Sequence, residues 1–216
     1  MNCSEIINIC VSVASIFIAL LALFQTKRQI TLSNKQQLFD RRLACYLEFN
    51  TIYALYITNK NHLEEADTFC HTNNLIFAWL TNCSDLEEMM LAISNPLHQE
   101  EQNVFLTKCE QLKNTAIEIS MIFNGSVANI AEDFIASYAD LLKAMYRQQV
   151  YISKLEEQNK KTPLVLEDYE KECNKMAEGL GLFQMRDNLK SLADQIVKKR
   201  VIEEMEDTLR LTKVKR

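Results

Sequence analysis

A run of 19 residues without a charged side chain lies near the start of this 216-residue chain. It extends from Ile6 to Phe24 and is rich in isoleucine, leucine, valine and phenylalanine. A helix of about 20 apolar residues crosses a hydrocarbon core of ~30 Å. A helix at the surface of a soluble protein, in contrast, has a polar face. The run therefore predicts a transmembrane helix within residues 1–26.

A cleaved signal peptide is the main alternative for such a run. Signal peptides begin with a positively charged region and end at a small-residue cleavage site. Here the run follows MNCSE, in which Glu5 is the one charged side chain, and it continues directly into QTKRQ. We therefore expect a retained membrane anchor.

Basic residues flank the run on one side. No lysine or arginine precedes it, and the residues that follow include Lys27, Arg28, Lys35, Arg41 and Arg42. Under the positive-inside rule the N-terminus lies outside and the rest of the chain lies in the cytoplasm. We expect the five basic side chains to contact anionic lipid headgroups. A role for them in binding nucleic acid or a nucleotide stays open.

The small and polar residues of the run follow one another at steps of three or four. They are Asn8, Ser12, Ser15, Ala19, Ala22 and Thr26. This spacing places them on one face of a helix, and we call them the small-residue stripe. Small residues let membrane helices approach closely, and hydroxyl groups can bond between helices. Three interpretations stay open: a plain anchor, a seam for self-association, or the lining of a pore with an alanine constriction.

Glycine and proline are scarce throughout the chain. It contains three glycines and two prolines, where average usage gives about 15 and 11. Strands joined by tight turns need more turn residues than this. The sequence therefore predicts an all-α protein, with one N-terminal transmembrane helix followed by a cytoplasmic antiparallel helical bundle.

The segment after the run predicts a stalk. Apolar residues recur at nearly helical spacing from Leu38 to Tyr56, and no glycine or proline interrupts them. The membrane helix either continues into this segment or bends near Ser33–Asn34, which could cap a new helix. We assign residues 27–59 to a juxtamembrane stalk helix and residues 60–216 to a cytoplasmic helical domain.

Helix-stopping residues divide this domain at four clear points: Pro96, Asn124–Gly125, Pro163 and Gly179–Gly181. Between the stops, apolar residues keep helical spacing, which predicts five to seven helices. One narrow face consists of Phe105, Cys109, Leu112, Ala116, Ile119 and Phe123. A broader face consists of Val127, Ile130, Phe134, Tyr138, Leu141, Leu142 and Met145.

The sequence contains no recognisable catalytic or metal-binding motif. It lacks a Gly-rich phosphate loop, a G-x-S-x-G elbow and a Glu-x-x-His pair. Cys70–His71, His62 and Cys83 lack the paired spacing of zinc ligands. We therefore expect no enzyme activity, no cofactor and no metal.

The charge balance and the cysteines restrict the partners and the compartment. The net charge of −5 argues against double-stranded nucleic acid as a partner. The seven cysteines form no C-x-x-C pair, which favours reduced thiols in a reducing compartment.

The stretch RQITLSNKQQLFDRRLACYLEF resembles the segment that follows the span in small bacterial membrane proteins, several of which resemble membrane effectors of anti-phage defence. Effectors of the Hailong type are the nearest candidate family, and the resemblance covers roughly residues 6–49. It implies an ion-permeable homo-oligomer, a tetramer or larger, in the bacterial inner membrane. It also implies control by a nucleotidyltransferase partner or by its nucleotide product.

The sequence thus leads to two hypotheses of different class. The first is a membrane-anchored oligomeric effector, an ion-permeable pore gated by its cytoplasmic helical domain in anti-phage defence. The second is a membrane-tethered scaffold or interaction protein with a plain anchor helix. In both, membrane lipid is a partner.

Overall fold

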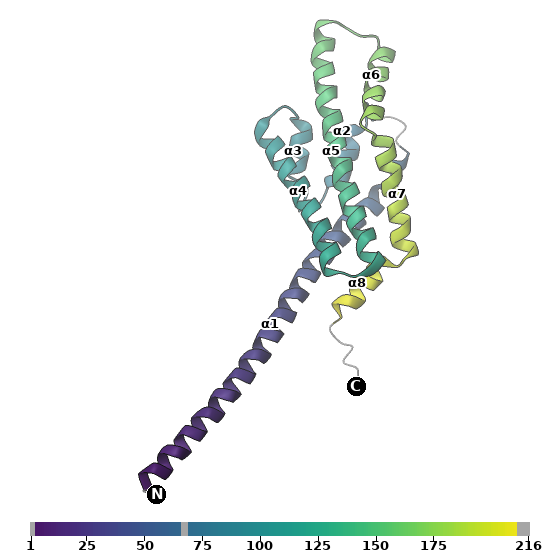
Figure 1. Ribbon diagram of the computed structural model, residues 1–216. Helices are drawn as coiled ribbons and strands as arrows, with labels where there is room; N and C mark the ends of the chain where they lie inside the picture. The colour runs from purple at the N-terminus through teal and green to yellow at the C-terminus, as the bar shows by residue number, and fades with distance from the viewer. Residues whose placement is uncertain (1–2, 66–68, 211–216) are drawn as a thin grey trace. The chain divides into compact units, whose positions relative to one another are not determined.

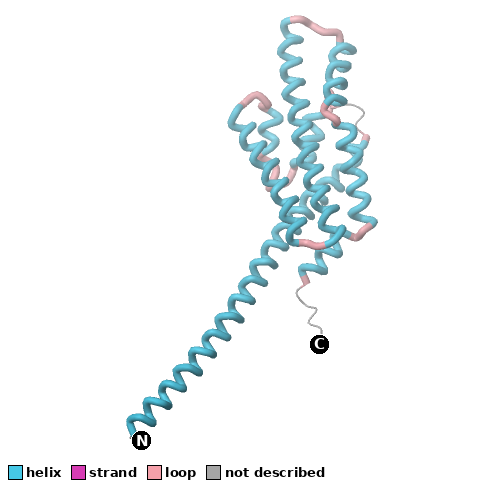
Figure 2. Tube along the Cα trace, viewed as in Figure 1, coloured by secondary structure: helices cyan, strands magenta, loops and turns pink. Residues whose placement is uncertain are grey.

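The computed structural model describes residues 3–65 and 69–210, with side chains described from residue 15 onward (Figure 1). Its regular structure is entirely α-helical, and the described residues include no strand (Figure 2). The prediction of an all-α fold is therefore confirmed.

The chain divides into two compact units, Met1–Arg41 and Arg42–Arg216. Helix α1 (Cys3–Glu64) contributes residues to both units. It continues through Ser33–Asn34 without a break. Of the two sequence-based alternatives for this segment, the continuous helix is therefore correct.

The first unit contains the apolar run. Residues 6–14 of the predicted span lie outside the residues whose side chains are described, and residues 15–24 are helical with exposed side chains. No helix offers, within the described residues, an apolar stretch of the length that a bilayer requires.

The second unit is a helical bundle around α5 (Gly125–Lys161). Helix α5 packs against each of the helices that follow α1, and Figure 1 shows α4 and α7 alongside it. The other helices are α2 (Asn73–Thr81), α3 (Met89–Ser94), α4 (Gln99–Ile122), α6 (Leu166–Gly179), α7 (Leu182–Lys198) and α8 (Val201–Leu209).

The stops predicted from the sequence coincide with helix ends. Helix α3 ends just before Pro96, α4 and α5 meet at Asn124–Gly125, and Pro163 lies between α5 and α6. Gly125 and Gly181 have φ angles of 79° and 71°, which glycine adopts more readily than other residues.

Seven helices, α2–α8, follow α1 in the described residues, which is the upper end of the five to seven that the sequence predicts for the helical domain. One additional break separates α7 from α8, where Arg200 has a φ of 52°. The apolar spacing of α7 slips at the adjacent Lys199, so a weak signal for this break is present in the sequence. The shortest of the described helices is α3, with six residues.

Aromatic side chains from α1 and α5 meet in the core of the second unit. The ring of Phe134 lies edge-on to the rings of Phe49, Tyr53 and Tyr56, with centroids 5.7–6.1 Å apart. All the residues of the two predicted apolar faces, on α4 and α5, are buried. The helix spacing in the sequence therefore identified the core correctly.

Candidate functional site

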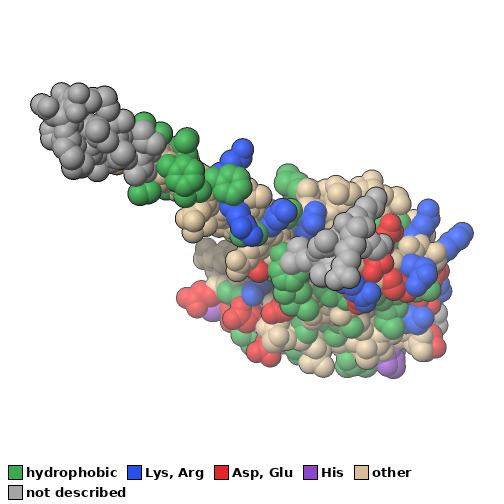
Figure 3. Space-filling view, turned by 90° about the horizontal axis from the view of Figure 1, so that it is seen from below, with side chains coloured by type: hydrophobic (Ala, Val, Ile, Leu, Met, Phe, Trp, Pro, Cys, Tyr) green, Lys and Arg blue, Asp and Glu red, His purple; other side chains and the backbone are tan. Residues whose placement is uncertain are grey.

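An apolar band is exposed on the part of α1 that belongs to the first unit. Seven of the nine residues from Ile16 to Phe24 are large and apolar, and their exposed fractions are 48–69%. Figure 3 shows these side chains in green, followed along the helix by basic side chains in blue. An exposed apolar surface of this kind marks a site of contact with lipid or with another protein.

The small-residue stripe lies partly within the described residues. Ser15, Ala19, Ala22 and Thr26 are exposed, whereas the side chains of Asn8 and Ser12 lie outside the description. The hydroxyl of Thr26 donates a hydrogen bond to the carbonyl of Ala22 on the same helix, at 2.9 Å. The hydroxyl proton of Thr26 is thus used within its own helix.

The five basic residues after the run do not share one environment. Lys27, Arg28, Lys35 and Arg41 are exposed in the first unit, whereas Arg42 is half-buried in the second. The Nε of Arg42 donates to the carbonyl of Ile122 at 2.9 Å. Since Ile122 is the last residue of α4, Arg42 satisfies one of the carbonyls that lack a partner at a helix end.

Two further polar contacts hold α1 within the second unit. The hydroxyl of Tyr46 donates to Oε1 of Glu206 on α8 at 2.6 Å, and the hydroxyl of Thr115 on α4 donates to Oε2 of Glu48 at 2.9 Å. Burial and the adjacent Glu206 carboxylate raise the pKa of Tyr46 to about 12. Tyr46 therefore remains a neutral donor at physiological pH.

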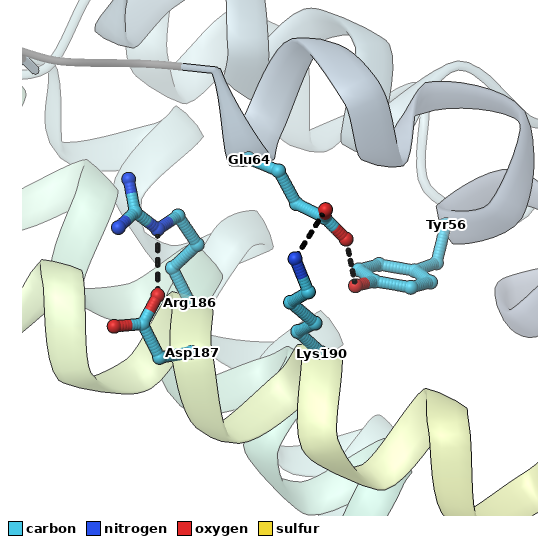
Figure 4. A network of polar contacts seen from close by, with 5 residues as sticks. All are labelled: Tyr56, Glu64, Arg186, Asp187 and Lys190. Carbon is cyan, nitrogen blue, oxygen red and sulfur yellow. Dashed lines mark hydrogen bonds and ion pairs between the residues drawn. The ribbon is translucent and has the colours of Figure 1, made fainter.

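The C-terminal end of α1 contacts α7 (Figure 4). Lys190 donates from Nζ to Oε2 of Glu64 at 2.7 Å, and the hydroxyl of Tyr56 donates to Oε1 of Glu64 at 3.5 Å. On the same face of α7, Nε of Arg186 lies 3.0 Å from Oδ1 of Asp187. The Glu64 carboxylate thus joins the end of α1 to the middle of α7.

A cavity of about 350 Å³ lies beside Glu48, between α1, the segment before α3, and α4. Asp85, Lys108 and Cys83 contribute to its lining. Burial raises the pKa of the Glu48 carboxyl above its ordinary value of 4.5, and the hydrogen bond from Thr115 opposes this effect. The cavity offers one carboxyl group of altered acidity, and the described residues that line it include no histidine that could act as its partner.

Among the side chains that the structure describes there is no group of three metal-binding residues, and no disulfide joins the five described cysteine side chains. Cys70 is buried with Cys173, Ile152 and Leu155. The adjacent His71 faces solvent, where its Nε2 lies 3.1 Å from Oε1 of Glu170. Cys70 and His71, considered as a zinc-ligand pair from the sequence, thus have different surroundings.

Sequence reasoning missed the contacts of Tyr46, Glu48 and Glu64 with helices far along the chain. Tyr46 and Glu206, for example, are separated by 160 residues. A partial signal exists, since Arg42, Tyr46, Phe49 and Tyr53 recur at helical steps. That spacing predicts a packed face of α1 but gives no partner for it.

Comparison of the chain with protein-family models, curated proteins and solved structures gave no match.

Proposed function

We propose that this protein is a membrane-anchored, oligomeric effector that forms an ion-permeable pore in the bacterial inner membrane, gated by its helical domain, in anti-phage defence. The N-terminus lies outside and residues 42–216 lie in the cytoplasm. The protein is not an enzyme and needs no cofactor.

The observation that carries this proposal is the apolar band at Ile16–Phe24, followed at once by basic residues. Leucine, isoleucine and phenylalanine each favour insertion at the centre of a membrane helix by roughly 0.3–0.6 kcal/mol. Residues 6–15 extend the band in the sequence to a length that fits a bilayer. Lipid is therefore the partner that best explains the exposed side chains.

The small-residue stripe supports self-association of the membrane helix. In a ring of four or more copies, the stripe of each copy faces the axis or its neighbour. Ser15 then lies midway along the pore, and Ala19 and Ala22 form a narrow apolar section that closes by losing water.

The helical domain supplies the control of the pore in this proposal. Helix α1 contributes to both units, and its residues 42–64 are held by Arg42, Tyr46, Glu48 and Glu64. A signal that rearranges these contacts acts on the same helix that carries the stripe. A nucleotidyltransferase or its nucleotide product is the source of the signal that the sequence resemblance implies.

Ion flux from liposomes tests the pore. Ser15→Leu places a large side chain on the stripe and should abolish flux through the reconstituted full-length protein. Ala14→Leu is the matched control, because Ala14 lies off the stripe by about a third of a turn. Ala14→Leu should leave flux unchanged. Unaltered flux through the Ser15→Leu variant would show that the stripe does not line a pore.

One observation favours a second candidate, a membrane-tethered scaffold with a plain anchor. The hydrogen bond from Thr26 to the Ala22 carbonyl uses a stripe hydroxyl within one helix, as in a lone span. Replacing residues 6–24 by a polyleucine anchor separates the two candidates in a phage-protection assay. A scaffold keeps its protective effect after this replacement, and a pore-forming effector loses it.

A further inference from the structure

Three cationic side chains of α5 have no acidic partner among the residues that the structure describes. They are Lys143, Arg147 and Lys154, and all three line one cavity of about 450 Å³. Within the described part of the chain, none of the three forms an ion pair. Other lysines of the bundle do, such as Lys113 with Asp140 at 2.6 Å and Lys190 with Glu64 at 2.7 Å.

The arrangement of the helices explains the cavity. Helices α4 and α6 both pack on α5, but among the described residues they do not pack on each other. Figure 1 shows α5 between them. The face of α5 that carries the three cations is therefore left open between its two neighbours, with Gln102 on α4 and Met176 on α6 at its sides.

The lining combines this charge with apolar surface. Leu106, Val150, Met176 and Leu180 are half-buried side chains of the cavity, and no lining residue is acidic. A local excess of positive charge in a chain of net charge −5 attracts an anion. The apolar walls favour an anion that also has an apolar body.

Two tyrosines complete the lining of the cavity, and hydrogen bonds to groups outside the cavity hold their side chains in position. The hydroxyl of Tyr146 donates to the carbonyl of Pro96 at 2.8 Å, and the hydroxyl of Tyr151 donates to Oε2 of Glu172 at 3.4 Å. Their hydroxyl protons are thus used elsewhere. The three cations and the amide of Gln102 remain as donors to a ligand, and the cations alone also supply positive charge.

We propose that the cavity between α4, α5 and α6 binds a phosphate ester with an apolar body, held by Lys143, Arg147 and Lys154. Arginine recognises phosphate through two parallel hydrogen bonds, and lysine adds point charges. The cations extend over about 16 Å of helix at 1.5 Å per residue, which suits a ligand longer than a free phosphate ion. All the residues of this binding site belong to the second unit, so the proposed site does not depend on whether the first unit forms a pore.

Titration calorimetry of the purified full-length protein in detergent tests the site with three probes. Hexyl phosphate represents a lipid-like ester. Adenosine monophosphate represents a nucleotide, a phosphate ester that carries an aromatic base. Inorganic phosphate lacks an apolar body. At least one ester should bind about tenfold or more tightly than inorganic phosphate. The ester that binds identifies the source of the ligand as lipid-like or nucleotide-like.

Two variants assign the binding to the cavity. Arg147→Gln removes an exposed charge and should raise the dissociation constant of the ester by at least about tenfold. Lys171→Gln removes a charge from an exposed position of α6 outside the cavity and should leave binding unchanged. Should Arg147→Gln melt at a lower temperature, Lys154→Gln, also at an exposed position, takes its place. Binding of neither ester, or equal binding by the wild-type protein and the cavity variant, overturns the proposal.

Discussion

At the scale of single residues, the left-handed backbone between α6 and α7 depends on glycine. Gly181 has a φ of 71°, and a Cβ at this position would lie 3.3 Å from Oε1 of Gln184. Gly179, two residues earlier, is the last residue of α6, and a Cβ there would meet no atom within 4 Å. The two glycines therefore differ in what an added methyl group would do.

We expect Gly181→Ala to lower the free energy of unfolding by about 1–2 kcal/mol, because an L-residue resists the left-handed conformation. Gly179→Ala should raise it by about 0.5–1 kcal/mol, because alanine favours the helix and restricts the unfolded chain. Urea unfolding followed by the fluorescence of Trp79, the one tryptophan of the chain, measures both. Equal effects of the two substitutions would contradict the conformational argument.

Glu48 gives the second unit a pH dependence. Burial raises the pKa of its carboxyl above 4.5, so the folded protein holds this proton more tightly than the unfolded chain. Stability contributed by the neutral group is complete below pH 4.5 and is lost as the pH rises through the folded-state pKa. Glu48→Gln removes this titration and preserves an oxygen that can accept the hydrogen bond from Thr115.

The Glu48→Gln variant should therefore gain stability relative to the wild-type protein between pH 4 and pH 7. Urea unfolding at both values, again with Trp79 fluorescence, checks the direction of the change. A stability difference that is constant with pH, or that moves in the opposite direction, would show that this carboxyl is not destabilised by burial.

At the scale of the elements, α5 organises the bundle through Phe134. Its ring contacts three aromatic rings of α1 and is completely buried. Phe134→Ala should lower the free energy of unfolding by about 3–5 kcal/mol, the range for large-to-small changes in a core. Met121→Ala on α4, where the side chain is 76% exposed, should change it by less than about 0.5 kcal/mol. A loss below about 1 kcal/mol in Phe134→Ala would contradict the central position of this ring.

The helices themselves were largely predictable from the sequence. The step of three or four residues from Phe105 to Phe123 identified the buried face of α4, and Pro96 and Pro163 marked real ends. Such signals are local, since they depend on which side of a helix is apolar and on which residues stop it. The break at Arg200 was not predicted, because arginine rarely adopts a left-handed conformation and the slip of the apolar spacing at Lys199 comes without a glycine or proline.

The contacts between helices were not predictable in this way. Asn73 is buried and donates from Nδ2 to the carbonyl of Met145 and to Oε1 of Gln149. Nothing in the spacing of Asn73 distinguishes it from an exposed asparagine. The cavity cations were missed for the same reason, since Lys143, Arg147 and Lys154 are ordinary in sequence and become a site only where α4 and α6 leave α5 uncovered.

At the scale of the whole molecule, the two units have opposite surface properties. The second unit buries large apolar side chains in a main core and a smaller cluster, whereas every large apolar side chain from Ile16 to Phe24 in the first unit is exposed. A protein that leaves this surface open in water has a strong tendency to associate. Under the proposed function, lipid covers this surface and the small-residue stripe contacts other copies of the chain.

The measurement that tests this account most directly is the native mass of the full-length protein in detergent, beside that of the fragment 42–216. We predict a defined tetramer or larger ring for the full-length chain and a smaller species for the fragment, because the stripe at Asn8–Thr26 provides the seam. A full-length monomer would contradict the central claim and leave the stripe as the surface of a plain anchor.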